Sequence, residues 1–175
     1  DCLLSRGLGD VYKRQDKDTS GLIIAAKNDL AHAALAAQLK DHSLARTYVC
    51  IVCGKIKDDS GTIDAPISRD ETSAVRRMVR PDGQQAVSHY EVLSQRNGLS
   101  FVKLQPETGR THQLRVHMAH IGCPLAGDWL YGTEDKTLIA RPALHSYELW
   151  FTQPVTGQEL HFTAPIPQDM QRLME

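Results

Sequence analysis

The sequence lacks any long apolar segment: nowhere in its 175 residues is there a run of about twenty apolar side chains, the length that a membrane-spanning helix requires. The amino-terminal residues also lack the basic segment followed by an apolar segment that marks a secretory signal peptide. Internal repeats and low-complexity linkers are absent as well. We therefore expect a cytoplasmic protein that does not contact a membrane, with a single core formed by a chain that is 41% hydrophobic.

Cysteine is also scarce, with four residues in the chain: Cys2, Cys50, Cys53 and Cys123. This number is too small for a fold held together by disulfides, so we expect reduced thiols. Cys50 and Cys53 have the CxxC spacing, but they fall in a predicted strand. Residues three apart in a strand face opposite sides, and a redox pair normally needs the start of a helix. Core packing is therefore the better interpretation of this pair.

An excess of positive charge is missing too, since the formal net charge is -1 and the isoelectric point is about 6.8. This balance excludes a protein that coats nucleic acid through its bulk charge, so any RNA binding would have to be local. Two local basic clusters exist: Arg76, Arg77 and Arg80 form the first, and Arg110 and Arg115 form the second. A basic cluster is more often an ordinary solvated face, so a further signal is needed.

The hydrophobic pattern and the turn residues predict an α+β fold with a mixed, largely antiparallel sheet flanked by helices. Asn97-Gly98 suits a tight hairpin because both residues tolerate positive φ. The predicted strands are 22–26, 46–53, 88–95, 99–105, 144–151 and 159–163. The segments 55–60 and 131–141 are predicted to be exposed loops.

Two helices are predicted. The first is capped by Asn28 or Asp29 and runs to about Lys40, and we expect its residues Leu30, Ala34 and Leu35 to face inward. The second begins near Thr111.

The segment 107–117, ETGRTHQLRVH, contains the densest group of polar residues in the chain. A predicted strand runs directly into it, which places positive charge at the edge of a sheet. From Thr111 onward apolar residues recur at helical spacing, while Arg115 projects from a neighbouring face. A guanidinium at such a buried rim needs a planar acid partner or a phosphate, because an unpaired buried charge costs several kcal/mol. An ordinary surface salt bridge is the alternative for Arg115 considered alone.

The candidate acid partner lies in the segment 16–21, DKDTSG, directly before the apolar run 22–26. Asp16 would open a strand at this point. Asp and Ser/Thr also favour simple turns, because their side chains hydrogen-bond nearby backbone amides, and Gly21 allows unusual dihedral angles. An Asx turn is therefore the alternative interpretation of this segment by itself.

Taken together, the ordered motifs of the chain resemble those of the RluA-type pseudouridine synthases, which isomerise uridines in ribosomal and transfer RNA. The resemblance runs from Asp16 to the last residue, and several motifs in the right order are much more specific than any one of them. The motifs are DKDTSG at 16–21, ARTYVCIVCG at 45–54, PDGQQAVSHYEVL at 81–93, TGRTHQLRVH at 108–117, IGCPLAGD at 121–128, LH at 144–145 and FTAPIP at 162–167.

The resemblance implies a pseudouridine synthase catalytic domain at 16–175 and an Asp-dependent isomerisation that needs no cofactor and no metal. Asp16 would be the essential carboxylate, acting either as a nucleophile on the ribose or as a base. Arg115 would pair with Asp16 and contact RNA, and Tyr48 would stack on the uracil. The residues expected to bind RNA or to line or brace the pocket are Arg14, Arg110, His112, Leu144 and His145. The expected substrate is large-subunit ribosomal RNA, with transfer RNA as the alternative, and we expect a monomer.

The segment before Asp16 departs from the family pattern. Family members carry His-Arg-Leu there, whereas this chain has Lys13-Arg14-Gln15, so only the arginine fits. Residues 1–15 also lack strand alternation or a helical stripe, and 10–15 looks like translated adapter sequence from a read library. We therefore expect 1–15 to be a non-native leader. On this hypothesis the first strands of the catalytic domain and any S4-like RNA-binding module are missing.

Two other functions fit parts of the sequence. His112, His117, His120 and Cys123 are chemically suitable zinc ligands, but His112 points away from the other histidines, and no Glu occupies the general-base place of an HExxH helix. The more serious alternative is an RNA-binding module without activity, because the segment before Asp16 is altered. RNA binding without isomerisation would distinguish that module from an enzyme.

Overall fold

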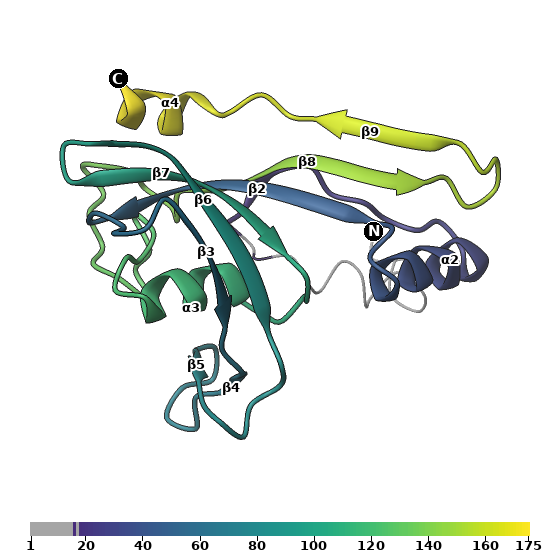
Figure 1. The fold of residues 1–175 in the computed structure, drawn as a ribbon, viewed down its shortest axis with the longest axis horizontal. Coiled ribbons are helices and arrows are strands. Elements are labelled where there is room, and N and C mark those ends of the chain that lie inside the picture. Colours follow the sequence, from purple (N-terminus) through teal and green to yellow (C-terminus); the bar gives the residue numbers. More distant parts are fainter. Residues whose placement is uncertain (1–15, 17) are drawn as a thin grey trace, which may run out of the picture.

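The computed structural model describes Asp16 and residues 18–175, which form a seven-stranded sheet and a small two-stranded sheet (Figure 1). The large sheet has the strand order β1-β8-β2-β7-β6-β3, and β9 pairs with β8. Every pair in it is antiparallel except β1 with β8, so the predicted α+β fold is confirmed. The elements are β1 Ser20–Gly21, α2 Asp29–Lys40, β2 Ala45–Cys53, β3 Ser60–Asp64, β4 Ile67–Arg69, β5 Arg77–Val79, β6 Val87–Arg96, β7 Leu99–Pro106, α3 Gln113–His120, β8 Leu144–Thr152, β9 Glu159–Thr163 and α4 Gln168–Met174.

The central strand β2 is covered on both faces, with α3 on one side of the sheet and α4 on the other (Figure 1). Cys50 lies in the core that includes Met118 of α3, whereas Ile51 lies in the core that includes Met170 of α4. Cys53 packs against the second core, so Cys50 and Cys53 face opposite sides as expected from their spacing, and both are free thiols. Burial on both faces explains why this strand has an almost continuous apolar sequence.

Helix α2 begins where the sequence predicted, because the Asn28 side chain accepts a hydrogen bond of 2.8 Å from the Ala31 backbone N–H. Leu35 is buried as expected, but Leu30 is 85% exposed, so its predicted inward orientation was wrong. The helix packs on the sheet through Ala31 and Leu35, which are four residues apart and share a face. Leu30 lies five residues before Leu35 and therefore points elsewhere.

The predicted hairpin at Asn97-Gly98 is confirmed, and the two predicted strands nearest the carboxyl terminus also pair with each other. Strands β6 and β7 are joined through Asn97 and Gly98, whose φ values are 52° and 76°, and β8 pairs antiparallel with β9. The predicted strand at 22–26 was wrong, since the ladder with β8 involves only Ser20–Gly21 and Ile23 is 53% exposed. Elements β3, β4, β5 and α4 were not predicted, because they are short and carry little periodic pattern.

No helix among residues 18–175 has both the length and the apolar character needed to span a membrane.

Gly21 allows β1 to lie directly against β8. Its φ is +98°, and a Cβ atom at this position would clash with the carbonyl oxygen of Ser146. We expect Gly21→Ala to lower the free energy of unfolding by about 3 kcal/mol, because backbone strain and the clash add. Chemical denaturation would measure this loss. Gly157→Ala is the matched control, since Gly157 has φ +69° but no atom within 4 Å of the added Cβ, and we expect it to cost only about 1 kcal/mol. Equal losses in the two variants would contradict the proposed clash.

Candidate active site

Asp16 lies in a cavity of about 590 Å³ at the amino-terminal end of α3. The size is within the usual range for sites that bind small molecules or single nucleotides. Side chains from β2, β8 and the segment before α3 meet here, although they are far apart in the sequence. The predicted site residues that line the cavity are Asp16, Tyr48, Arg110, His112 and Leu144. Arg14 lies outside the described residues.

Strand β1 holds Asp16 in place. Ser20 and Gly21 pair in parallel with His145 and Ser146 of β8, and the Thr19 N–H donates a hydrogen bond of 3.0 Å to the backbone carbonyl of Asp16. His145 is 2% exposed and is not among the residues that line the cavity. Its Nδ1 lies 2.9 Å from the Ser20 hydroxyl and its Nε2 lies 3.3 Å from the Ala164 carbonyl. His145 therefore braces β1, the short strand that follows Asp16 in the sequence.

The carboxylate of Asp16 lies between two nitrogen-bearing side chains of the segment 107–117. Its Oδ1 is 3.8 Å from Nε2 of His112, and its Oδ2 is 3.8 Å from Nη1 of Arg115. The structure thus brings Asp16 and Arg115 together, as the sequence led us to expect. Both distances exceed hydrogen-bond length, so neither side chain hydrogen-bonds the carboxylate, and Asp16 lines the cavity.

The close partner of Arg115 is Asp128, which the sequence analysis did not single out. Arg115 Nε and Nη2 each donate a hydrogen bond of 2.8 Å to the two carboxylate oxygens of Asp128. Asp128 is 0% exposed and also accepts the backbone N–H groups of Leu130 and Tyr131. A buried arginine requires a planar acid, and the Gly-Asp pair at 127–128 in the quoted motifs was the signal that could have identified it.

Tyr131 completes the cluster, although the sequence analysis placed it in an exposed loop. It is only partly exposed, and the Arg115 guanidinium lies 5.1 Å from the centre of its ring. Its hydroxyl oxygen is 2.7 Å from Nδ1 of His112 and accepts the backbone N–H of Arg77 at 2.9 Å. Tyr131 therefore contacts both residues that flank Asp16.

The segments 55–60 and 131–141 were predicted to be exposed loops, but each contains a buried side chain, Ile56 and Ile139 respectively.

Burial shifts the ionisation of the two central groups in opposite directions. Desolvation raises the pKa of Asp16 from 3.8 to about 6, although the Arg115 charge and the His112 backbone N–H oppose this change. Desolvation and, to a smaller extent, the positive charges of Arg115 and Arg77 together lower the pKa of His112 from 6.5 to about 4. At neutral pH the site therefore contains an ionised Asp16 beside a neutral His112.

The turn before α3 is held by Gln113, which is buried. Its Oε1 accepts hydrogen bonds from the Thr108 hydroxyl at 2.7 Å and from the Arg110 N–H at 2.9 Å. Its Nε2 donates to the Val87 carbonyl and to the Ser88 hydroxyl, both at 2.9 Å. His112 itself adopts a left-handed conformation with φ 58°, which the rigid turn supports.

Two of the three histidines named as possible zinc ligands, His112 and His117, have other partners. His117 is fully buried, and its two ring nitrogens lie 2.9 Å from the Ser88 hydroxyl and 3.0 Å from the Ala65 carbonyl. His112 is engaged with Tyr131 as described above. Within the described part of the chain, no group of three or more His, Cys, Asp or Glu side chains is arranged to hold a metal ion.

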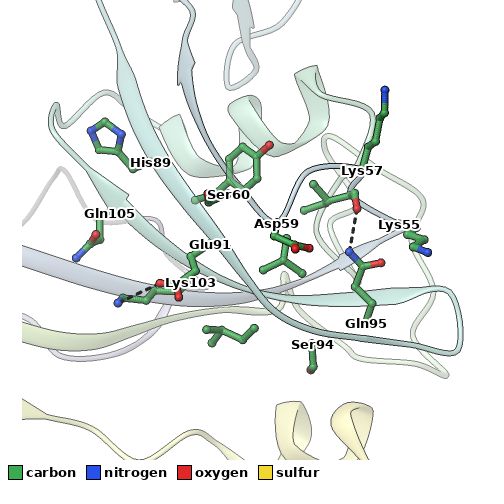
Figure 2. Close-up of a pocket in the computed structure, with 14 residues that line it drawn as sticks. Lys55, Lys57, Asp59, Ser60, His89, Glu91, Ser94, Gln95, Lys103 and Gln105 are labelled. Carbon is green, nitrogen blue, oxygen red and sulfur yellow. Dashed lines mark hydrogen bonds and ion pairs between the residues drawn. The ribbon is translucent and has the colours of Figure 1, made fainter.

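A second groove, of about 880 Å³, lies over β3, β6 and β7 and contains none of the predicted site residues (Figure 2). Figure 2 shows two interactions within this groove: Lys103 forms an ion pair of 3.4 Å with Glu91, and Gln95 donates a hydrogen bond to the Ile56 carbonyl. Lysines and acidic residues share the groove, so it has no dominant charge. The cavity around Asp16 is therefore the better candidate for the active site.

Comparisons with known proteins show which family the chain is similar to. The sequence profile of a family described as RNA pseudouridylate synthase matches residues 10–120. An uncharacterised RNA pseudouridine synthase of Bacillus subtilis, YlyB, is 47% identical over 165 residues, which cover 94% of this chain and 54% of that protein. The ribosomal large subunit pseudouridine synthase D of Zymomonas mobilis is 42% identical over 184 residues, covering 97% of this chain and 58% of that protein. The chain thus spans little more than half the length of these curated relatives.

A solved structure shows the same fold. The human RNA pseudouridylate synthase domain containing 1 aligns with a TM-score of 0.75 and 27% sequence identity, over 86% of this chain and 66% of that one. The resemblance inferred from the ordered motifs is therefore confirmed by sequence and by structure. The chain belongs to the RNA pseudouridylate synthase family.

Proposed function

We propose that this protein isomerises uridine to pseudouridine in large-subunit ribosomal RNA, with Asp16 as the essential carboxylate. The observation that carries the proposal is the ionised Asp16 in a cavity, 3.8 Å from both Arg115 and His112, in a member of this family. Relatives named ribosomal large subunit pseudouridine synthase D, which are 40–42% identical to this chain, support the choice of RNA. Such a reaction would take place in the cytoplasm.

The reaction exchanges one glycosidic bond for another. The bond between ribose C1′ and uracil N1 breaks, the base turns, and a bond between C1′ and C5 forms. The hydrogen on C5 passes to solvent and N1 takes up a proton, so nothing is oxidised and no cofactor is required. The demands on the protein are a carboxylate beside the ribose and a surface that holds the free uracil. Asp16 meets the first demand, and Tyr48 and Leu144 line the same cavity and meet the second.

The cavity also has the charge needed to bind a nucleotide that has been turned out of folded RNA. Its lining includes Lys40, Arg46 and Arg110, which offer cations to the phosphates. Arg110 is held in place because its Nε donates a hydrogen bond of 2.9 Å to the Gln85 carbonyl. Unstacking a base costs a few kcal/mol, and local contacts of this kind can offset it. The near-neutral net charge of the chain is then no obstacle to RNA binding.

Tritium release tests the proposal directly. Transcripts of large-subunit ribosomal RNA that carry 5-tritiated uridine would be incubated with the protein, and we expect tritium to appear in the solvent. Transfer RNA transcripts prepared in the same way serve as the comparison substrate. Release from transfer RNA alone would overturn the ribosomal substrate while keeping the isomerase activity. RNA binding without release from either substrate would show a binding module instead of an enzyme.

The pKa of Asp16 predicts how activity depends on pH. If the ionised carboxylate acts, kcat/KM should rise about tenfold per pH unit below pH 6 and level off above it, since the pKa of Asp16 is about 6. His112, whose pKa is about 4, stays neutral through this range. A pH–rate profile between about pH 5 and pH 8 would measure the acid limb. A flat profile down to about pH 5 would contradict the raised pKa.

A further inference from the structure

The contact between Tyr131 and His112 determines which nitrogen of the histidine carries the proton. The Tyr131 hydroxyl oxygen accepts the backbone N–H of Arg77, and it lies 2.7 Å from His112 Nδ1. A tyrosine hydroxyl has a single hydrogen to donate. Among the described residues, His112 Nδ1 is the one group in a position to accept that hydrogen.

The groups around His112 also favour a neutral ring with its hydrogen on Nε2. If His112 carried its proton on Nδ1, two N–H donors would point at the Tyr131 oxygen and the hydroxyl hydrogen would lack a protein acceptor. A doubly protonated His112 would place a third positive charge beside Arg115 and Arg77 in a partly buried site. The neutral ring with its hydrogen on Nε2 avoids both costs. Nε2 is the atom that faces Oδ1 of Asp16, at 3.8 Å.

We propose that Tyr131 is a positioning residue that fixes His112 as the Nε2–H tautomer, so that His112 presents an N–H group to Asp16. The catalytic part of this inference rests on the proposed isomerase function, whereas the tautomer itself does not. With this tautomer an N–H dipole faces Oδ1 and a guanidinium faces Oδ2, each at 3.8 Å, so both favour the ionised form of the carboxylate electrostatically. With the other tautomer a nitrogen lone pair would face the carboxylate instead.

Nuclear magnetic resonance of the 15N-histidine-labelled protein tests the tautomer without any assay of activity. Two-bond 1H–15N correlations at about pH 7.5 distinguish a protonated ring nitrogen from one with a lone pair, and the spectrum of His112→Gln assigns the His112 signals. We expect the wild-type protein to show a protonated Nε2 and an unprotonated Nδ1. We expect Tyr131→Phe to shift both His112 signals towards a mixture of tautomers. Tyr147→Phe is the matched control and should leave them unchanged.

Kinetics then test the consequence for the reaction. We expect Tyr131→Phe to lower kcat in proportion to the Nε2–H fraction that is lost, about twofold for an equal mixture of tautomers, with KM nearly unchanged because the RNA contacts remain. His112→Gln keeps an N–H group at the end of the side chain and should retain most of the activity, whereas His112→Leu should lose about tenfold. Both replacements carry the same cost of a positive φ at position 112, so their difference reports the donor.

The outcomes separate this inference from the proposed function. A wild-type His112 that is protonated on Nδ1, or a tautomer that Tyr131→Phe leaves unchanged, would overturn the inference. A Tyr131→Phe variant with the altered tautomer and full kcat would overturn its catalytic part. A wild-type protein with the expected tautomer but no isomerase activity on any RNA would overturn the proposed function, while the positioning of His112 by Tyr131 would stand.

Discussion

Replacing Asp16 by asparagine is expected to abolish isomerisation, by at least about 10³-fold, while RNA binding remains. The amide has the shape of the carboxylate but can neither attack the ribose nor take a proton from it. The cations that line the cavity are unchanged, so the RNA should still bind. Tritium release would measure turnover, and filter binding would measure affinity. Asp58→Asn makes the same chemical change at an exposed position and should leave both unchanged.

The same replacement should stabilise the fold at neutral pH. The pKa of Asp16 is raised from 3.8 to about 6 in the folded state, so the folded protein binds the proton more tightly than the unfolded chain does. The stabilisation from this proton is fully present below pH 4 and is lost as the pH rises through about 6. At pH 8 the buried charge therefore costs the fold up to about 3 kcal/mol, which asparagine avoids.

Chemical denaturation of Asp16→Asn at about pH 8 and about pH 4 would measure this effect. We expect the variant to be more stable than the wild type at the higher pH and close to it at the lower pH. A variant that lost activity and stability together at pH 8 would point to damage of the fold, and would contradict a purely chemical role for Asp16.

Replacing Asp128 by asparagine is expected to lower the free energy of unfolding by about 3–5 kcal/mol, because it leaves the buried Arg115 charge without its close partner. Asp128 and Arg115 are 0% and 4% exposed, so water cannot substitute for the lost carboxylate. Urea denaturation would measure the loss. Activity should fall as well, since Arg115 is then free to move towards Asp16, which is 3.8 Å away.

Two further measurements separate these effects. The negative charge of Asp128 helps to raise the pKa of Asp16, so the acid limb of the pH–rate profile should move to lower pH in Asp128→Asn. The double variant Arg115→Met/Asp128→Leu removes both charges and should recover much of the stability without recovering activity. A single Asp128→Asn variant with wild-type stability would show that the ion pair does not hold Arg115 in place.

The features that the sequence predicted well are those set by neighbouring residues. The Asn28 cap marked the start of α2, and Asn97-Gly98 marked the β6–β7 hairpin, because each acts through its own backbone within a few residues. Features set by distant partners were predicted less well. The apolar run 22–26 suggested a strand, but β8 extends its ladder only to Gly21. Leu30 was predicted to face the core, but α2 packs on the sheet through another face and leaves Leu30 exposed.

The residues of the candidate site also fall into those that the sequence could identify and those that only folding brings together. Asp16, Tyr48 and Arg115 could be chosen from the sequence because their types and ordered motifs match a known chemistry. Tyr131 could not, because nothing local requires it to face His112. Asp128 stands in one of the quoted motifs, but no local pattern shows that it faces Arg115. His145 was expected to line or brace the pocket, and the structure shows that it braces Ser20 beneath the cavity.

The order of amino acids alone specifies the family and makes Asp16 and Arg115 the candidate acid and guanidinium, since these depend on residue type and spacing along the chain. Only the folded chain shows that Arg115 is bound closely to Asp128 and that Asp16, whose pKa is raised, lies 3.8 Å from the same arginine. The physical reason is that burial and the distances between charges arise from strands and loops that meet only after folding. The spacing of residues along the sequence does not determine this burial or these distances.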